Sequence, residues 1–334
     1  MSDAIGIAVV GAGAIAQIAH LPVLDKMKGV QIVALCDNDA GKARALADRF
    51  DIPNVVTDIE DLLEIADVDA VLITTPNHLH EPHVLSALAA GRHVLCERPL
   101  ALTARGVERI LAAAKRADRR VLVANNHRFR VDVQALTGFV RGGELGRLTG
   151  IRAGTYQPKS TVDGWRHRRP EAGGGAFLEH GLPLLDLALW LAEFPEPTRV
   201  SAHMLRDRGA QAVEDAMLVQ FETAQGISMS FDVTWSYVGL EQRWWFQLLA
   251  ERGSATLGPL RVVKELNGRP QLVSPTGGMA RESAFTQSYR AELAHFLAVI
   301  REETEYYAPT DQVRVHTLLE AIYRSADEGK EVLL

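Results

Sequence analysis

Residues 5–16 read IGIAVVGAGAIA, an apolar run that leads directly into a glycine-rich turn. The apolar residues 5–10 predict a strand that is covered on both faces. In the turn, Gly11 permits a tight bend, Gly13 lets a pyrophosphate approach the backbone, and small Ala16 allows close packing of helix on strand. Because the free N–H groups of a helix start bind anions, this GxGxxA turn predicts a dinucleotide site that includes Gly11, Gly13, Ala14 and Ile15.

A membrane segment is the alternative interpretation of this end of the chain. Residues 4–24 are mostly apolar and nearly long enough to span a bilayer. No basic residue precedes them, and Gln17, His20 and Pro22 interrupt them. We therefore expect neither a signal peptide nor an anchor, no membrane partner and a cytoplasmic location.

Short β-branched runs alternate with helical patterns as far as residue 123. Strands are expected at 5–10, 31–36, 70–74, 93–96 and 121–123, and helices at 14–27, 39–50, 58–66, 81–90 and 103–117. Asp39 and Thr103 are the expected N-caps of two of these helices. The alternation predicts an α/β fold that opens with a Rossmann-type, doubly wound parallel sheet.

The pattern changes after residue 124, where longer strand-like runs follow one another at 148–156, 216–222, 226–237 and 244–250. Such runs predict an α+β domain with a large, mostly antiparallel sheet. Helices expected at 181–192, 285–302 and 311–328 would cover one face of it. The predicted domains are 1–123 for the cofactor and 124–334 for substrate binding and oligomerisation, with the C-terminal helix 311–328 packing back.

Composition limits the possible partners. The 334 residues include 36 Lys and Arg against 42 Asp and Glu, a formal net charge of −6, which argues against a nucleic-acid binder. The hydrophobic fraction of 47% is enough for a real core. The two cysteines, Cys36 and Cys96, sit in apolar runs, which indicates reduced core thiols; packing is favoured over a nucleophilic role for Cys96.

Asp37 stands at the end of the second predicted strand, 26 residues after Gly11. A carboxylate there can accept both ribose hydroxyls of an adenosine and repels a 2′-phosphate, so NAD is favoured over NADP. The structural alternative is a role in the N-cap region of the next helix, which Asp37-Asn38-Asp39 also suits.

Further motifs identify a family. TPNHLH at 75–80 and AAGRHVLCERP at 89–99 resemble the TPNxxH and AGKHVxxEKP motifs of the Gfo/Idh/MocA (glucose–fructose oxidoreductase, inositol dehydrogenase and rhizopine catabolism) family. The resemblance continues through GELG at 143–146, Trp165-Arg166, the glycines at 173–175 and Ser325-Ala326. It therefore covers nearly the whole chain.

The resemblance implies a Rossmann domain joined to an α/β domain with a large open sheet. It also implies reversible hydride transfer between a nicotinamide and a hydroxyl-bearing carbon of a sugar, inositol or related polyol. By position, Thr75, Pro76, Asn77 and His80 would line the nicotinamide side, and Glu97 and Arg98 would contact the cofactor. The resemblance places Trp165, Arg166 and Asp186 on the substrate side.

Two residues depart from the family pattern where the proton is handled. Arg98 replaces the lysine of EKP, and Arg holds charge but shuttles protons poorly. In GAFLEHGLPLLD at 175–186, aligned with the family's DxGxHxxD, the usual histidine is Pro183 and the first aspartate is Glu179. Pro183 suits the first turn of a helix. The candidate catalytic residues are therefore Arg98, Glu179 and His180, although His180 could equally cap the helix.

Other titratable residues have plainer interpretations. No cysteine or carboxylate is spaced to complete a zinc site with His78, His80 and His83. We therefore interpret them as loop and helix-start histidines and expect no metal. Arg166, His167, Arg168 and Arg169 could attract an acidic substrate, or form a solvated loop.

The leading hypothesis is an NAD-dependent oxidoreductase that acts on a small sugar or polyol. One alternative is a dinucleotide-binding paralogue without turnover, acting as a sensor or accessory subunit. Another is an enzyme that oxidises its substrate transiently to permit elimination or glycoside cleavage. A homodimer or homotetramer through the C-terminal sheet is expected, with Trp235, Tyr237, Trp244 and Phe246 as candidate face aromatics unless they contact the domain's own helices.

Overall fold

Six parallel strands form the first sheet of the protein. The computed structural model describes residues 4–159, 164–207, 212–273 and 282–334. The strands are β1 (Ile5–Val10), β2 (Val30–Cys36), β3 (Asn54–Val56), β4 (Ala70–Ile73), β5 (His93–Cys96) and β6 (Val121–Val123), in the order β3-β2-β1-β4-β5-β6. This order is that of a doubly wound dinucleotide-binding sheet, so the predicted Rossmann fold is confirmed.

Both faces of this sheet are covered, as its continuous apolar strands predicted. Ile7 and Val9 point into one buried cluster, and Ala8 and Val10 into another. The helices of this unit are η1 (Ala16–His20), α1 (Leu21–Leu24), α2 (Ala40–Arg49), α3 (Ile59–Leu63), η2 (Asn77–Leu79), α4 (His80–Ala89), α5 (Ala104–Ala117) and α9 (Ala284–Ile300). Asp39 and Thr103 accept from the main chain at the starts of α2 and α5, which confirms both predicted N-caps.

A nine-stranded sheet forms the second unit. Its order is β14-β13-β12-β11-β7-β10-β9-β8-β15, and β7 with β10 is its parallel pair, so the sheet is mostly antiparallel as predicted. The strands are β7 (Leu148–Pro158), β8 (Pro197–Leu205), β9 (Ala216–Thr223), β10 (Ser228–Tyr237), β11 (Arg243–Ala250), β12 (Gly253–Leu257), β13 (Arg261–Leu266), β14 (Arg269–Leu272) and β15 (Val332–Leu333).

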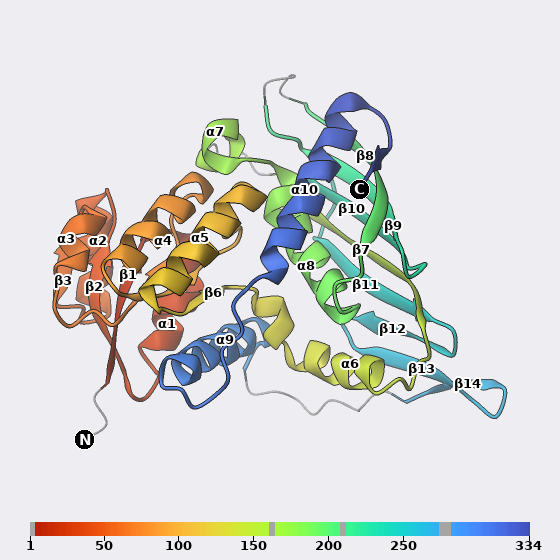
Figure 1. Cartoon of the computed structure of the whole chain (residues 1–334), viewed down its shortest axis with the longest axis horizontal. Coiled ribbons are helices and arrows are strands. Elements are labelled where there is room, and N and C mark those ends of the chain that lie inside the picture. The colour runs from red at the N-terminus through yellow and green to blue at the C-terminus, as the bar shows by residue number, and fades with distance from the viewer. Residues whose placement is uncertain (1–3, 160–163, 208–211, 274–281) are drawn as a thin grey trace. The chain divides into compact units, whose positions relative to one another are not determined.

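Helices cover one face of the nine-stranded sheet (Figure 1). They are α6 (Val131–Arg141), α8 (Leu182–Leu191) and α10 (Asp311–Glu328), and their apolar residues share one core with the sheet. The short elements of this unit are η4 (Trp165–His167), α7 (Arg169–Ala172) and η5 (Phe177–Gly181). A further short helix, η3 (Asn126–Phe129), lies at the boundary of the two units. The opposite face of the sheet carries no helix of the described chain.

The division of the chain differs from the predicted one. Residues 124–126 and 282–313 group with the first unit, so 124–334 is not one continuous domain. The reason is the packing of α9: Tyr289, Phe296 and Leu297 are buried in the cluster that contains β1 residues. Helix 285–302 therefore does not cover the second sheet, and most of α10 does, through residues such as Leu318 and Ile322.

Three of the four aromatics that were predicted on the exposed face of the second sheet, Trp235, Trp244 and Phe246, lie on its core side instead. Phe246 is buried in the core, and Trp235 and Trp244 pack against it. Trp245 pairs with Gly154 of β7 and immediately precedes Phe246 in β11. Because successive side chains of a strand point to opposite faces, Trp245 projects from the face opposite to Phe246.

The part of the chain that the structure describes contains neither a membrane-spanning helix nor a disulfide. Within the described residues, no helix has an apolar stretch long enough to cross a bilayer. Cys36 and Cys96 are free and buried, as predicted. Burial raises the pKa of the Cys36 thiol to about 12 and that of Cys96 well above its ordinary value.

Candidate active site and cofactor site

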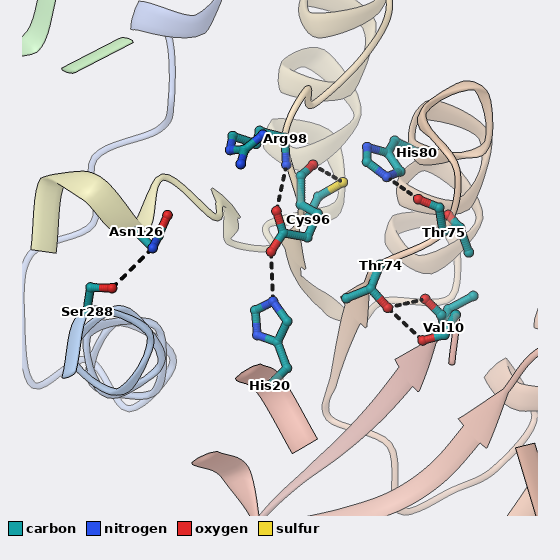
Figure 2. Close-up of polar contacts among 11 residues, drawn as sticks. Val10, His20, Thr74, Thr75, His80, Cys96, Arg98, Asn126 and Ser288 are labelled. Atoms are coloured by element: carbon teal, nitrogen blue, oxygen red, sulfur yellow. Dashed lines mark hydrogen bonds and ion pairs between the residues drawn. The ribbon is translucent and has the colours of Figure 1, made fainter. Parts of the chain in front are cut away.

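The glycine turn after β1 is held against the end of β4. Gly11 has φ +101°, and a Cβ on it would lie 2.8 Å from the main chain of Thr74. The Thr74 hydroxyl donates to the carbonyl oxygens of Val10, at 3.1 Å, and Gly11, at 2.7 Å (Figure 2). A Cβ on Gly13 would meet only the Thr74 oxygen, at 3.8 Å. The turn is thus rigid at Gly11 and open at Gly13, which suits close approach of a pyrophosphate.

Asp37 lies beside this turn, at the end of β2. Its Oδ2 accepts from the Ala12 N–H at 2.7 Å, and its Oδ1 accepts from the Asp39 N–H at 3.0 Å. The Lys42 ammonium lies 3.0 Å from Asp37 Oδ2. The structure therefore brings the predicted ribose acceptor to the predicted phosphate turn. Sequence reasoning missed Lys42, although its place in the first turn of α2 was readable.

The loop after β4 carries Thr75, Pro76 and Asn77, and His80 begins α4. The imidazole of His80 is buried, with Nδ1 2.7 Å from the Pro99 oxygen and Nε2 2.8 Å from the Thr75 oxygen. Burial lowers the pKa of His80 against the opposing effect of these carbonyls. Because a neutral imidazole has one N–H, it donates to one carbonyl at a time. His80 therefore lies between the loop after β4 and the loop after β5 and bonds one of them at a time.

Glu97 follows β5 and pairs with His20, a residue that interrupts the apolar run 4–24. Its Oε1 lies 2.8 Å from Nε2 of His20, which is fully buried, and its Oε2 accepts from the Arg98 N–H at 3.3 Å (Figure 2). Burial acts to raise the pKa of Glu97, but the hydrogen bond and charge of His20 and the charge of Arg98 outweigh it and lower the pKa. Glu97 is therefore held as a carboxylate at the carboxyl edge of the parallel sheet.

Glu179 and His180 lie in η5, a π-helical turn of the second unit in which the Leu182 N–H donates to the Phe177 oxygen. A proline ring clashes with the carbonyl four residues before it. For Pro183 that carbonyl belongs to Glu179, so the wider turn accommodates the proline. Pro183 thus shapes the segment that carries Glu179 and His180.

Charged and aromatic neighbours surround this turn. Arg166 Nε lies 3.2 Å from Glu179 Oε1, and the Arg166 guanidinium lies over the Trp165 ring at 4.4 Å. The rings of His180 and Trp235 meet edge to face at 6.3 Å. The structure therefore brings together four of the predicted site residues with Trp235.

The basic run 166–169 is paired with carboxylates. Besides the Arg166 contact, Arg168 lies 2.7 Å from Glu171 and Arg169 lies 3.6 Å from Asp327. Much of the positive charge of this run is therefore already balanced by the protein.

Asp186, predicted on the substrate side, forms a bidentate ion pair. Its two oxygens accept from Nε of Arg128 at 2.8 Å and from Nη2 at 2.5 Å, and Asp186 is 2% exposed. This geometry gives Asp186 a structural contact, and its contact with substrate stays a prediction.

The histidines of the first unit offer no metal cage. No group of three His, Cys, Asp or Glu side chains able to hold a metal ion occurs among the residues that the structure describes. Burial and the neighbouring His80 and His78 lower the pKa of His83 to about 4.

The glycine turn, the acid after β2 and the strand order 3-2-1-4-5-6 define a dinucleotide-binding protein with a second, α+β unit. Residues 5–125 match the model of an oxidoreductase family with an NAD-binding Rossmann fold, and residues 133–256 match the Gfo/Idh/MocA C-terminal domain. Together these matches span more than half of the chain. The protein belongs to the Gfo/Idh/MocA oxidoreductase family, and its first unit is an NAD-binding Rossmann domain.

Two curated dehydrogenases and a solved structure are similar to this chain along most of their length. The chain is 26% identical to D-glucoside 3-dehydrogenase of Escherichia coli K12, covering 100% of this chain and 98% of that protein. It is 29% identical to D-apiose dehydrogenase of Paraburkholderia graminis, covering 94% and 86%. The solved structure of GenD2 from gentamicin A biosynthesis, in complex with NAD, superposes with a TM-score of 0.85 at 26% identity over 99% of this chain and 97% of that one.

Proposed function

We propose that this protein is an NAD-dependent oxidoreductase that moves a hydride between the nicotinamide and a hydroxyl-bearing carbon of a sugar, inositol or related polyol. The observation that carries the proposal is the carboxylate of Asp37, 2.7 Å from the Ala12 N–H of the glycine turn, in a chain of this family. The similar dehydrogenases named above act on glucosides and on apiose, which supports a carbohydrate substrate.

The residues of the first unit fit a dinucleotide. The open side of Gly13 leaves room for the pyrophosphate, and Asp37 offers carboxylate oxygens to the adenosine ribose. We place Ala14, Ile15, Thr75, Pro76, Asn77, His80 and Glu97 in the same binding site. When bound, the nicotinamide supplies the hydride acceptor or donor. Asp37 favours NAD over NADP because its charge repels a 2′-phosphate.

The proton on the substrate oxygen needs a group that titrates near neutral pH. Arg98 stays charged and polarises the oxygen. Glu179 Oε1 lies 3.2 Å from Arg166 Nε, so this carboxylate is already engaged in an ion pair. We therefore assign proton transfer to His180, with Glu179 as the second candidate, and we place Trp165, Arg166 and Asp186 on the substrate side.

The test is to mix the purified protein with NAD and a panel of sugars and polyols and to follow the absorbance of the reduced cofactor. We expect turnover with at least one of them, strongly reduced in H180A and less reduced in E179Q. Absence of turnover with every hydroxyl compound, while NAD still binds, counts against dehydrogenase activity.

Arg98 and Pro183 favour a second candidate, a paralogue that binds NAD without turnover as a sensor or accessory subunit. The double variant R98K/P183H separates the two. A large gain in turnover supports a decayed site, whereas no gain or a loss supports different chemistry. Transient oxidation followed by elimination or glycoside cleavage yields no net reduced cofactor, so product masses test it.

We also propose that the helix-free face of the second sheet forms a homodimer or homotetramer. On it the Tyr156 hydroxyl donates to Asp232 at 2.5 Å, and the Tyr156 ring lies 4.9 Å from Trp245 and 5.4 Å from Tyr237. Light scattering should give a dimer or tetramer for the wild type and a smaller species for W245E. A monomeric wild type contradicts this assembly.

A further inference from the structure

Glu214, which no comparison or motif singles out, lies at the centre of the polar contacts that hold the η5 turn. It precedes β9 and is 1% exposed. Its Oε2 accepts from the Gly175 N–H at 2.9 Å, and its Oε1 accepts from the Phe177 N–H at 3.0 Å. These two amides lie at the start of the turn that carries Glu179 and His180. The carboxylate therefore binds the donors that a helix start leaves without an intrahelical partner.

Further contacts fix Glu214 itself. The Tyr323 hydroxyl of α10 donates to Oε1 at 2.9 Å, and the Ala176 N–H donates to the main-chain oxygen of Glu214 at 2.8 Å. A Cβ on Gly175 would lie 2.1 Å from that oxygen, so the close approach requires glycine. Residues 175–177 are thus bound on both the side chain and the main chain of Glu214.

The next residue, Asp215, holds the aromatic ring beside His180. Its Oδ1 accepts from the Trp235 Nε1–H at 2.8 Å, and its main-chain oxygen accepts from the Trp235 N–H at 3.1 Å. Its Oδ2 accepts from the Asp207 N–H at 2.9 Å. Trp235 lies edge to face with His180, at 6.3 Å, and with His167, at 4.8 Å.

We propose that Glu214 and Asp215 are positioning residues that place the His180 imidazole from two sides. Glu214 fixes the main chain of residues 175–177, and Asp215 fixes the Trp235 indole against which the imidazole lies. Both side chains are buried, so the dipeptide acts through other residues. Its effect on turnover rests on the proposed function, but its effect on His180 does not.

Each residue has an isosteric variant that removes one acceptor. In E214Q the side chain would accept from one of the two amides and present its NH₂ group to the other. D215N would likewise lose either the Trp235 or the Asp207 contact. Y323F is the matched control, because it removes one donor to Glu214 and leaves both main-chain amides bound.

The test is the NMR spectrum of protein labelled at the histidine ring carbons, with H180N and H167N used for assignment. The Trp235 ring current shifts both imidazoles. We expect E214Q to move the His180 resonance and leave that of His167 in place, D215N to move both, and Y323F to move neither. Thermal unfolding by circular dichroism verifies that each variant is folded.

An unmoved His180 resonance in folded E214Q and D215N overturns the proposal, as does an equal displacement of all histidines in both variants. With a substrate in hand, we expect E214Q to lower kcat at least 10-fold while the Kd for NAD stays within 2-fold. If the wild type shows no turnover, the proposed function fails and the spectra still decide the positioning role.

Discussion

Nε2 of His20 lies 2.8 Å from Oε1 of Glu97, although the two residues are 77 positions apart in the chain. The pair joins the π-helical segment η1, which follows the glycine turn, to the end of β5. Since His20 is fully buried and Glu97 nearly so, the contact is part of the core of the first unit and links the segment after the glycine turn to the loop of Arg98.

Replacing His20 by Ala should destabilise the protein. The change leaves the buried Glu97 without this hydrogen bond, which costs about 1–3 kcal/mol for a buried polar group. Urea unfolding at pH 7 measures the loss, and H20Q, which keeps a donor, should recover part of it. An H20A variant as stable as the wild type would mean that the His20–Glu97 contact makes no net contribution to the free energy of unfolding.

The same pair predicts a direction for the pH dependence. The pKa of Glu97 is lowered, so its contribution to stability is fully present above the ordinary glutamate pKa of ~4.3 and is lost as the pH falls through the lower folded value. In H20A, His20 no longer counteracts the effect of burial, which raises the pKa of Glu97. Acid unfolding of H20A should therefore begin at a higher pH than that of the wild type.

The two glycines of the turn should respond differently to alanine. At Gly11, φ +101° and the Thr74 main chain 2.8 Å from a Cβ predict that G11A destabilises the first unit. At Gly13 there is space, so G13A should unfold within about 0.5 kcal/mol of the wild type. Its Cβ nevertheless occupies the approach of the pyrophosphate, and calorimetry should show at least 10-fold weaker NAD binding. Unchanged NAD affinity in G13A contradicts the placement of the pyrophosphate.

Asp37 should determine cofactor choice. D37A removes a charged acceptor, a loss of about 1.5–3 kcal/mol that corresponds to roughly 10–150-fold weaker NAD binding. Because the repulsion of a 2′-phosphate also disappears and Lys42 remains, the ratio of NADP to NAD affinity should rise. D39A, which removes only the N-cap of α2, should cost about 1 kcal/mol of stability and leave that ratio unchanged.

Pro183 should control the shape of the η5 turn. In P183A an N–H becomes available to the Glu179 oxygen, and the clash of the proline ring is gone. The turn should then relax toward an α-helix and move His180 relative to Trp235. We expect lower turnover without loss of thermal stability, together with a changed His180 ring-current shift. P22A, which changes the corresponding proline after η1, should leave that resonance in place.

The sequence predicted the parallel sheet well because its strands are uniformly apolar. Strand β8 was missed because Val200 is its one buried residue and the others are half-buried or exposed, and β3 because none of its three residues is buried. Helix α9 was recognised as a helix but assigned to the wrong unit, since an apolar face shows that a helix packs and does not show against what.

The candidate site likewise has a part that the sequence predicts and a part that it does not. Asp37 and the glycine turn are readable because their spacing follows from one strand–turn–helix unit. The partners His20 for Glu97, and Glu214 for the η5 turn, come from distant parts of the chain. Only the folded structure reveals these contacts, because no local pattern marks them.

Hydride transfer to NAD is the central claim, and deuterium tests it directly. The purified protein is mixed with NAD and a sugar or polyol that carries deuterium at its carbinol carbons. The reaction is quenched during turnover, and the mass of the nicotinamide cofactor is measured by mass spectrometry. Our account predicts one deuterium in the reduced cofactor, for lasting and for transient oxidation alike. A cofactor that binds and yet acquires no deuterium from any member of the panel contradicts it.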